Sequence, residues 1–218
     1  MTAQRSYYVI AIDGPAASGK SSVARELARR LNFVYVNSGA MYRSVTWVVL
    51  NHGIDPNDKE TIAKFITDAH LDGKLLDGEF HLLINNADLT PHLHEDLVNA
   101  EVSRVSTVPQ VRKLLVQRMR DYSASHDLVI EGRDIGSVVF PDTPYKFYID
   151  ASPEVRAQRR AAQGLRDEIA QRDRADSSRS ASPLVIAKDA EVIDSSLLTV
   201  SQVVEEIVGQ VRKKGLRI

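Results

Sequence analysis

Residues 7–21 read YYVIAIDGPAASGKS, a stretch that combines the signs of a buried strand with those of a helix start. Tyr7 to Ile12 is a short run of aromatic and β-branched residues, which is typical of a buried strand. The run ends in Asp13-Gly14-Pro15, and apolar residues then recur at helical spacing from Gly19 to Leu31. We therefore predict a strand, a tight turn and a helix in this order.

The predicted turn carries the pattern G-x-x-x-x-G-K-[ST], the P-loop. Its glycines allow successive backbone N–H groups to face one centre, and the helix that follows adds the positive end of its dipole. A polyphosphate suits such a site: Lys20 would reach the β- and γ-phosphates, and the Ser21 hydroxyl would ligate Mg²⁺. The residues expected to bind ATP are Gly14, Pro15, Ala16, Ala17, Ser18, Gly19, Lys20, Ser21 and Ser22. Kinases, GTPases and motor ATPases share this pattern, so the reaction stays open at this point.

Strand and helix patterns alternate along the rest of the chain, which predicts an α/β fold with a parallel sheet covered on both faces. Short runs punctuated by glycine and asparagine between Leu71 and Pro91 indicate a small antiparallel insert. Further strands are expected at Phe33 to Val36, Leu128 to Ile130, Tyr145 to Ile149 and Val192-Ile193. Further helices are expected at Gly39 to Asn51, Asn57 to Ala69, Glu95 to Ser106, Val111 to Ser123, from Ser152-Pro153, and from the capping-box pair Thr199 and Gln202 to Lys213.

The bulk composition excludes several classes of protein. The chain has 218 residues, 43 % of them hydrophobic, which is enough for one main core. Its 28 basic residues balance 29 acidic ones, so no overall attraction to nucleic acid or membranes is expected. The absence of cysteine rules out disulfides, thiolate metal sites and a cysteine nucleophile. Without a membrane span or secretory signal, the chain is expected in the cytoplasm.

Two arginines beside turn residues suggest a second anion site. Arg43 follows the second predicted strand in the segment NSGAMYR, and Arg133 follows the third in EGRD. Because parallel sheets bind ligands at the carboxyl ends of their strands, Lys20, Arg43 and Arg133 could converge on one pocket. The alternative is that each arginine pairs with a surface carboxylate.

With these segments, the chain resembles the bacterial cytidylate kinase family of nucleoside monophosphate kinases. The similarity lies in IDGP with the P-loop, SGAMYR, EGRDIGSVVFP and RDR running into DSSR, and it covers nearly the whole chain. It implies a P-loop three-layer α/β fold with a five-stranded parallel sheet in the order 2-3-1-4-5, a small antiparallel insert and a helical lid. The implied parts are a core of residues 1–57, 106–155 and 181–218, a monophosphate-binding insert of about 58–105, and a lid of about 156–180.

The resemblance also implies roles for particular residues. Arg43 and Arg133 would hold the acceptor phosphate, while Asp176, Arg172 and Arg179 would hold ribose and phosphate. Lys20, Arg133, Arg172 and Arg179 would be the catalytic groups. The residues that would read cytosine are Ser38, Ser103, Arg112 and Asp134. The chain departs from the common family pattern at Asn37 and Glu131, where aspartate is frequent, and residues 160–172 form a shorter segment than in many relatives.

The predicted reaction is transfer of the γ-phosphoryl group of ATP to CMP or dCMP, with ATP and Mg²⁺ as cofactors and no nucleic-acid or membrane partner. A monomer is expected. The alternatives are a kinase of UMP or AMP, and a nucleotide-binding module without kinase activity. The arginine-rich residues 156–179 are interpreted as a lid that excludes water, with a solvated basic face as the alternative.

Three isolated features receive weaker interpretations. His92 and His94 could suggest a metal pair, but no third ligand is near in the sequence, which favours solvated or hydrogen-bonded roles. Trp47 is interpreted as a core residue rather than a platform for base stacking. Asp13 is the candidate for orienting Mg²⁺ or water indirectly, without binding the ion itself.

Overall fold

A computed structural model of the chain describes residues 7–162, 173 and 184–216. The strands are β1 (Val9–Asp13), β2 (Val34–Asn37), β3 (Leu71–Leu76), β4 (Glu79–Ile84), β5 (Ala87–Asp88), β6 (Leu128–Gly132), β7 (Tyr145–Asp150) and β8 (Glu191–Asp194). The α-helices are α1 (Lys20–Leu31), α2 (Ser38–Asn51), α3 (Lys59–Asp68), α4 (Asp96–Val105), α5 (Pro109–Ser123), α6 (Pro153–Ala162) and α8 (Val200–Lys213). Two short turns complete the set, the 3₁₀ turn η1 (Thr90–His92) and the π-helical turn η2 (Ile135–Val139).

The sheet is larger than predicted. Among the described residues it has eight strands, with the order β3-β4-β2-β6-β1-β7-β8 and β5 paired to β4. The five parallel strands of the core run β2-β6-β1-β7-β8, which is the predicted order. The predicted count of five is wrong for the whole sheet, because β4 of the antiparallel insert pairs with β2 and continues the same sheet.

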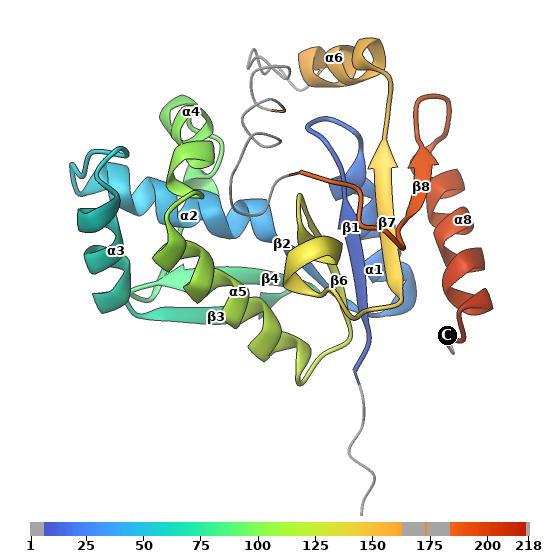
Figure 1. The fold of residues 1–218 in the computed structure, drawn as a ribbon, viewed down its shortest axis with the longest axis horizontal. Coiled ribbons are helices and arrows are strands. Elements are labelled where there is room, and N and C mark those ends of the chain that lie inside the picture. Colours follow the sequence, from blue (N-terminus) through green and yellow to red (C-terminus); the bar gives the residue numbers. More distant parts are fainter. Residues whose placement is uncertain (1–6, 163–172, 174–183, 217–218) are drawn as a thin grey trace, which may run out of the picture.

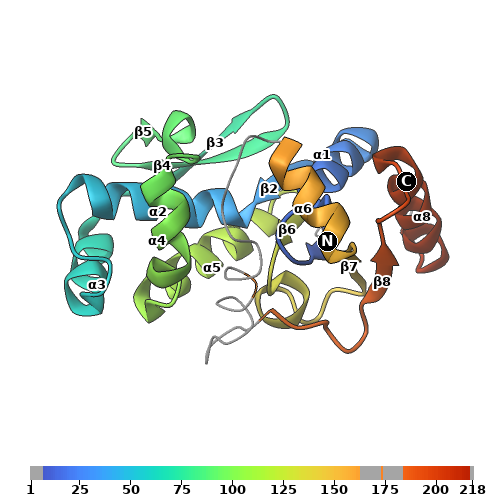
Figure 2. The same ribbon diagram turned by 90° about the horizontal axis from the view of Figure 1, so that it is seen from above.

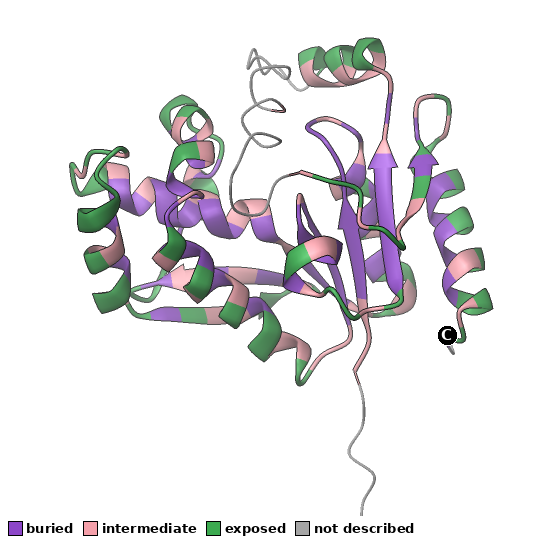
Figure 3. Ribbon diagram, in the orientation of Figure 1, coloured by how far each residue is buried: buried purple, intermediate pink, exposed green. Residues whose placement is uncertain are grey.

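Alternate residues of the central strands face two separate layers of helices. Ile10 and Ile12 of β1 pack with α1 and α8, whereas Ala11 between them belongs to the core that includes α2, α4 and α5. All three side chains are fully buried, as expected for parallel strands covered on both faces (Figure 3). The prediction of a sheet with helices on both faces is therefore confirmed.

The insert contributes to the core instead of standing apart from it. Ile62 and Ile66 of α3 and Phe80 of β4 are buried in the same apolar cluster as Val45 of α2 and Leu115 of α5. Figures 1 and 2 show α3 and α4 gathered at one end of the molecule and α8 at the other. The boundaries of the core, insert and lid stay a prediction, and most of the predicted lid lies outside the described residues.

Helix ends follow the local signals in the sequence. Thr199 and Gln202 form the predicted capping box at the start of α8. Asn37 caps α2 by accepting a hydrogen bond from the N–H of Ala40, at 2.9 Å. No helix of the described residues has both the length and the apolarity needed to cross a membrane.

Candidate active site

The P-loop lies where predicted, between β1 and α1, and its backbone requires glycine at two positions. Gly14 has φ +154°, and a Cβ there would lie 2.1 Å from the backbone oxygen of Ile149 on β7. Gly19 has φ +89° and is the N-cap residue of α1. A side chain at Gly14 would push β7 away from the turn, so the loop can pass this close to the sheet only as glycine.

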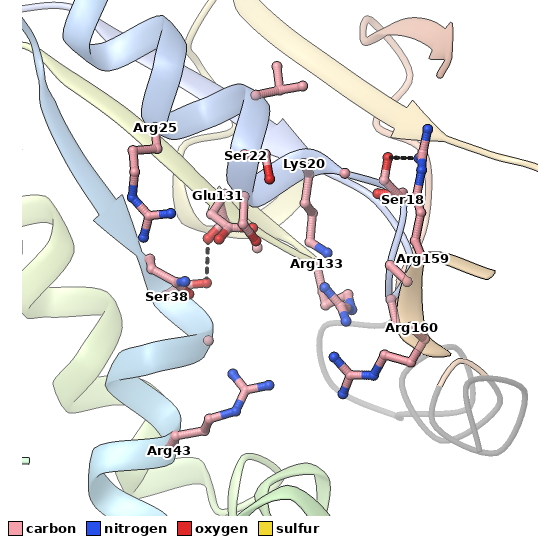
Figure 4. A pocket seen from close by; sticks show the side chains of 18 of the residues that line it. Ser18, Lys20, Ser22, Arg25, Ser38, Arg43, Glu131, Arg133, Arg159 and Arg160 are labelled. Carbon is pink, nitrogen blue, oxygen red and sulfur yellow. Dashed lines mark hydrogen bonds between the residues drawn. The ribbon is translucent and has the colours of Figure 1, made fainter. Parts of the chain in front are cut away.

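The loop borders a cleft of about 890 Å³, a size that suits small-molecule ligands. Residues Ala16 to Ser22 line one side of it, while Gly14 and Pro15 are not among the lining residues. Lys20 is buried, and its ammonium group donates a hydrogen bond to the backbone oxygen of Pro15 at 2.9 Å. Figure 4 shows this ammonium group pointing into the cleft.

Residues of α6 and of the turn after β8 brace the loop from outside. Arg159 donates to the backbone oxygen of Ser18 (3.1 Å) and to that of Ser195 (2.7 Å). Arg156 donates to the backbone oxygen of Ala16 at 3.2 Å and forms an ion pair with Asp173. The Asp173 carboxylate in turn accepts a hydrogen bond from the N–H of Ala16 at 3.1 Å. A loop amide therefore already binds an anionic group, as the P-loop interpretation requires.

Two of the arginines predicted to bind the acceptor phosphate line the same cleft as Lys20. Arg133 follows β6, and Arg43 lies on α2, five residues after Ser38. In Figure 4 their guanidinium groups and that of Arg160, from α6, point toward a common space near the Lys20 ammonium group. The predicted convergence of Lys20, Arg43 and Arg133 on one pocket is thus what the structure shows.

A buried ion pair forms part of the cleft wall. Arg112 of α5 and Asp134, which follows β6, are both buried, and the Arg112 guanidinium donates to the Asp134 carboxylate. The same guanidinium lies over the Tyr42 ring, 5.7 Å from its centroid. Ser38 and Ser103 also line the cleft, so the structure brings together the four residues predicted to read cytosine.

Glu131 is a polar group at the site whose individual role the sequence interpretation did not assign. Its carboxylate is buried and accepts a hydrogen bond from the Tyr35 hydroxyl at 2.8 Å, while its backbone oxygen accepts one from Ser38. Burial, followed by the Glu131 charge, raises the pKa of Tyr35, which keeps this phenol a donor. The position of Glu131 at the carboxyl end of a parallel strand, beside the P-loop strand, was the available signal.

Asp13 lies behind the P-loop rather than in the cleft lining. Its carboxylate accepts hydrogen bonds from the N–H groups of Ile135 and Gly136, both at 2.8 Å, and so holds the η2 turn against β1. Burial raises the pKa of Asp13 to about 6, although the two backbone hydrogen bonds act in the opposite direction. These contacts indicate a structural clamp on the segment that follows Arg133 and Asp134.

The raised pKa of Asp13 predicts a pH-dependent stability. The folded protein holds this proton more tightly than the unfolded chain, whose carboxyl has a pKa of 3.8, so the stabilisation is present below pH 3.8 and lost as pH rises through about 6. The difference between the free energies of unfolding of wild type and of Asp13→Asn should therefore fall by about 2 kcal/mol between pH 4 and pH 7. Urea unfolding of both proteins at several pH values measures this, and a pH-independent difference would contradict it.

Other predicted residues lie away from the cleft or beyond the described chain. Arg172, Asp176 and Arg179 lie outside the described residues. His92 stacks on Trp47 with ring centroids 4.4 Å apart, and its ring nitrogen is 2.6 Å from a Glu95 carboxylate oxygen. Trp47 is partly buried against the core of α2, α4 and α5. His94, in contrast, lines the cleft.

A P-loop and a facing group of arginines in one cleft define a P-loop phosphotransferase. The family model for cytidylate kinase matches residues 10–213. A cytidylate kinase of Clostridium botulinum (strain Okra / Type B1) is 40 % identical over 215 residues, covering 94 % of this chain and 97 % of the relative. The chain is likewise 40 % identical to a bifunctional pantoate ligase/cytidylate kinase of Synechococcus elongatus, covering 99 % of this chain and 44 % of that protein. The chain therefore belongs to the cytidylate kinase family.

A solved structure supports the fold alone. The crystal structure of TT1252 from Thermus thermophilus matches 98 % of this chain and 100 % of its own, with a TM-score of 0.51 and 18 % identity. At this identity the likeness concerns the arrangement of the sheet and helices, and the family rests on the sequence matches.

Proposed function

We propose that this chain transfers the γ-phosphoryl group of ATP to CMP or dCMP by direct in-line displacement, giving ADP and CDP or dCDP. The observation that carries the proposal is the single cleft lined by the P-loop lysine and by Arg43, Arg133, Arg112 and Asp134. One cleft with two anion-binding walls can hold a donor and an acceptor phosphate next to each other, which a transfer without a covalent intermediate requires.

The donor triphosphate belongs on the P-loop. Its oxygens would accept hydrogen bonds from the loop amides, and Lys20 would neutralise charge on the β- and γ-phosphates. Binding would require Lys20 to exchange its hydrogen bond with Pro15 for one with phosphate, and it would require Asp173 to leave the Ala16 amide.

The residues beside the P-loop also fit a magnesium ion. The Ser21 hydroxyl and the buried Glu131 carboxylate both line the cleft, and oxygen ligands of this kind suit Mg²⁺. No group of three His, Asp or Glu residues that could hold a metal occurs among the described residues, so the nucleotide phosphates would supply most of the ligands. When bound, Mg²⁺ would neutralise charge on the β- and γ-phosphates of ATP.

The acceptor phosphate belongs between Arg43 and Arg133. Each guanidinium group can donate two parallel hydrogen bonds to phosphate oxygens. These bonds would orient the attacking oxygen and also neutralise part of the negative charge of the phosphate. Arg133 lies between the Lys20 ammonium group and the Arg43 side chain in Figure 4, where it can contact the transferred group. By family resemblance we also assign Arg172, Arg179 and Asp176 to phosphate and ribose binding.

The Arg112–Asp134 pair matches the hydrogen-bonding edge of cytosine. The exocyclic amino group of cytosine donates, which suits the carboxylate, and its ring nitrogen and carbonyl accept, which suits the guanidinium. Uracil presents a carbonyl and a ring N–H instead and reverses part of this pattern. Because the two side chains already hold each other, the base would meet a preformed edge, with Ser38 and Ser103 beside it.

A coupled assay of ADP release across CMP, dCMP, UMP, AMP and GMP tests the proposal. We expect kcat/KM to be highest for CMP and dCMP, with little ADP release in the absence of an acceptor. A strong preference for AMP would remove the cytidylate assignment, and ADP release indifferent to added monophosphates would indicate a nucleotide-binding module without an acceptor. We further propose that the chain acts in the cytoplasm. We also propose that it is a monomer, which sedimentation of the purified protein would check.

A further inference from the structure

His94 occupies a fixed place in the wall of the cleft, between η1 and α4. The side-chain amide of Asn99 donates a hydrogen bond to the His94 backbone oxygen at 3.0 Å. The oxygen of the same Asn99 side chain accepts from Arg43 Nε at 3.5 Å. Asn99 therefore ties the backbone of His94 to the guanidinium group that faces the acceptor phosphate.

The charges that act on the His94 ring are positive. Burial, then Arg43 of α2 and Arg160 of α6, lower the pKa of His94 below its usual value. The neighbouring carboxylate of Glu95 contacts His92 and Trp47 instead. With no nucleotide in the cleft, burial and the two guanidinium groups therefore disfavour a second proton on the imidazole.

We propose that His94 binds the acceptor phosphate, donating a ring N–H to a phosphate oxygen beside Arg43. The inference rests on the proposed function, since it needs a nucleoside monophosphate in this part of the cleft. A dianionic phosphate compensates the two guanidinium charges, so its arrival favours a proton on the imidazole. Acceptor binding and protonation of His94 are then linked, and each strengthens the other.

This linkage has a definite direction. If the imidazole pKa is higher with acceptor bound than without it, the acceptor binds more tightly as pH falls from 8.5 toward 6.5. The second ionisation of a phosphate monoester lies near pH 6, so the acceptor itself stays mainly dianionic in this range. A contact made equally in the ground state and in the transition state changes KM and leaves kcat nearly constant.

The test measures KM for CMP, KM for ATP and kcat at pH 6.5, 7.5 and 8.5 in wild type, His94→Ala, His94→Gln and the control His92→Ala. His92 is the matched control because it lies two residues away and contacts Glu95 and Trp47. We expect His94→Ala to raise KM for CMP about tenfold at pH 6.5, with a smaller rise at pH 8.5. Because glutamine does not titrate, KM for CMP of His94→Gln should change much less with pH than KM for CMP of wild type. His92→Ala should leave all three constants near wild type.

Calorimetric titration of CMP in two buffers with different ionisation enthalpies gives a second readout. Wild type should take up more protons on binding than His94→Gln. Equal proton uptake in wild type and His94→Gln would overturn the assignment, and so would an unchanged KM for CMP in His94→Ala. A rise in KM for ATP as large as the rise in KM for CMP would also overturn it, because it would indicate a general structural defect. If wild type does not phosphorylate CMP at any of these pH values, the proposed function fails and takes the inference with it. If wild type does so and the His94 variants match it, only the inference fails.

Discussion

Replacement of Lys20 by alanine is expected to lower kcat/KM at least about 10³-fold, while the protein still folds. Lys20 is the P-loop residue whose ammonium group can neutralise the negative charge that develops on the β- and γ-phosphates as the bond to the leaving oxygen breaks. In the structure it donates a hydrogen bond to the backbone oxygen of Pro15, a contact within the loop itself. Removing it should therefore affect the reaction far more than the core.

The control for Lys20→Ala is Lys113→Ala, which removes an exposed lysine from α5. Steady-state kinetics should show wild-type activity for Lys113→Ala, and thermal unfolding should place both variants within about 4 °C of wild type. Lys20→Met, which keeps the alkyl chain, should be as inactive as Lys20→Ala. Wild-type turnover in either Lys20 variant would refute the assigned role.

Asp134→Asn is expected to lower kcat/KM for CMP about 100-fold, with a much smaller effect on UMP, so that base discrimination is lost. The carboxylate is buried beside Arg112, and asparagine keeps its shape but offers an amide in place of one acceptor oxygen. The amino group of cytosine then loses a charged partner, whereas the O4 of uracil gains a donor. KM for ATP should change much less, because the ATP phosphates are assigned to the P-loop and not to Asp134.

Two controls separate recognition from stability in this variant. Asp142→Asn makes the same chemical change at an exposed position and should leave the acceptor profile unaltered. Urea unfolding of Asp134→Asn is also needed, because breaking a buried ion pair leaves Arg112 with an uncompensated charge. A folded Asp134→Asn protein with the wild-type ratio of CMP to UMP activity would count against the role of Asp134 in reading the base.

Much of this architecture was predictable from local patterns. The run from Tyr7 to Ile12 and the helical spacing after Gly19 identified β1, the turn and α1, because strand and helix periods are properties of neighbouring residues. The positions of Arg43 and Arg133 after strands sufficed to predict that they share a cleft with Lys20, because the carboxyl ends of parallel strands meet at one edge of the sheet.

Features that depend on distant contacts were not predictable in this way. The pairing of β4 with β2 extends the sheet beyond five strands, and it joins Tyr35 to Glu79, residues with no shared local pattern. The clamp between Asp13 and the η2 turn joins residues more than a hundred positions apart. The position of His94 in the cleft wall likewise depends on how η1 and α4 pack against α2, which the spacing of His92 and His94 does not specify.

A crystal structure with CMP and a non-hydrolysable ATP analogue bound together tests the shared cleft most directly. The account predicts the γ-phosphate analogue within hydrogen-bonding distance of Lys20 Nζ and the CMP phosphate within that distance of both Arg43 and Arg133. The CMP ring should contact the Arg112–Asp134 pair. Nucleotides in separate cavities, or a CMP phosphate remote from both arginines, would contradict the account.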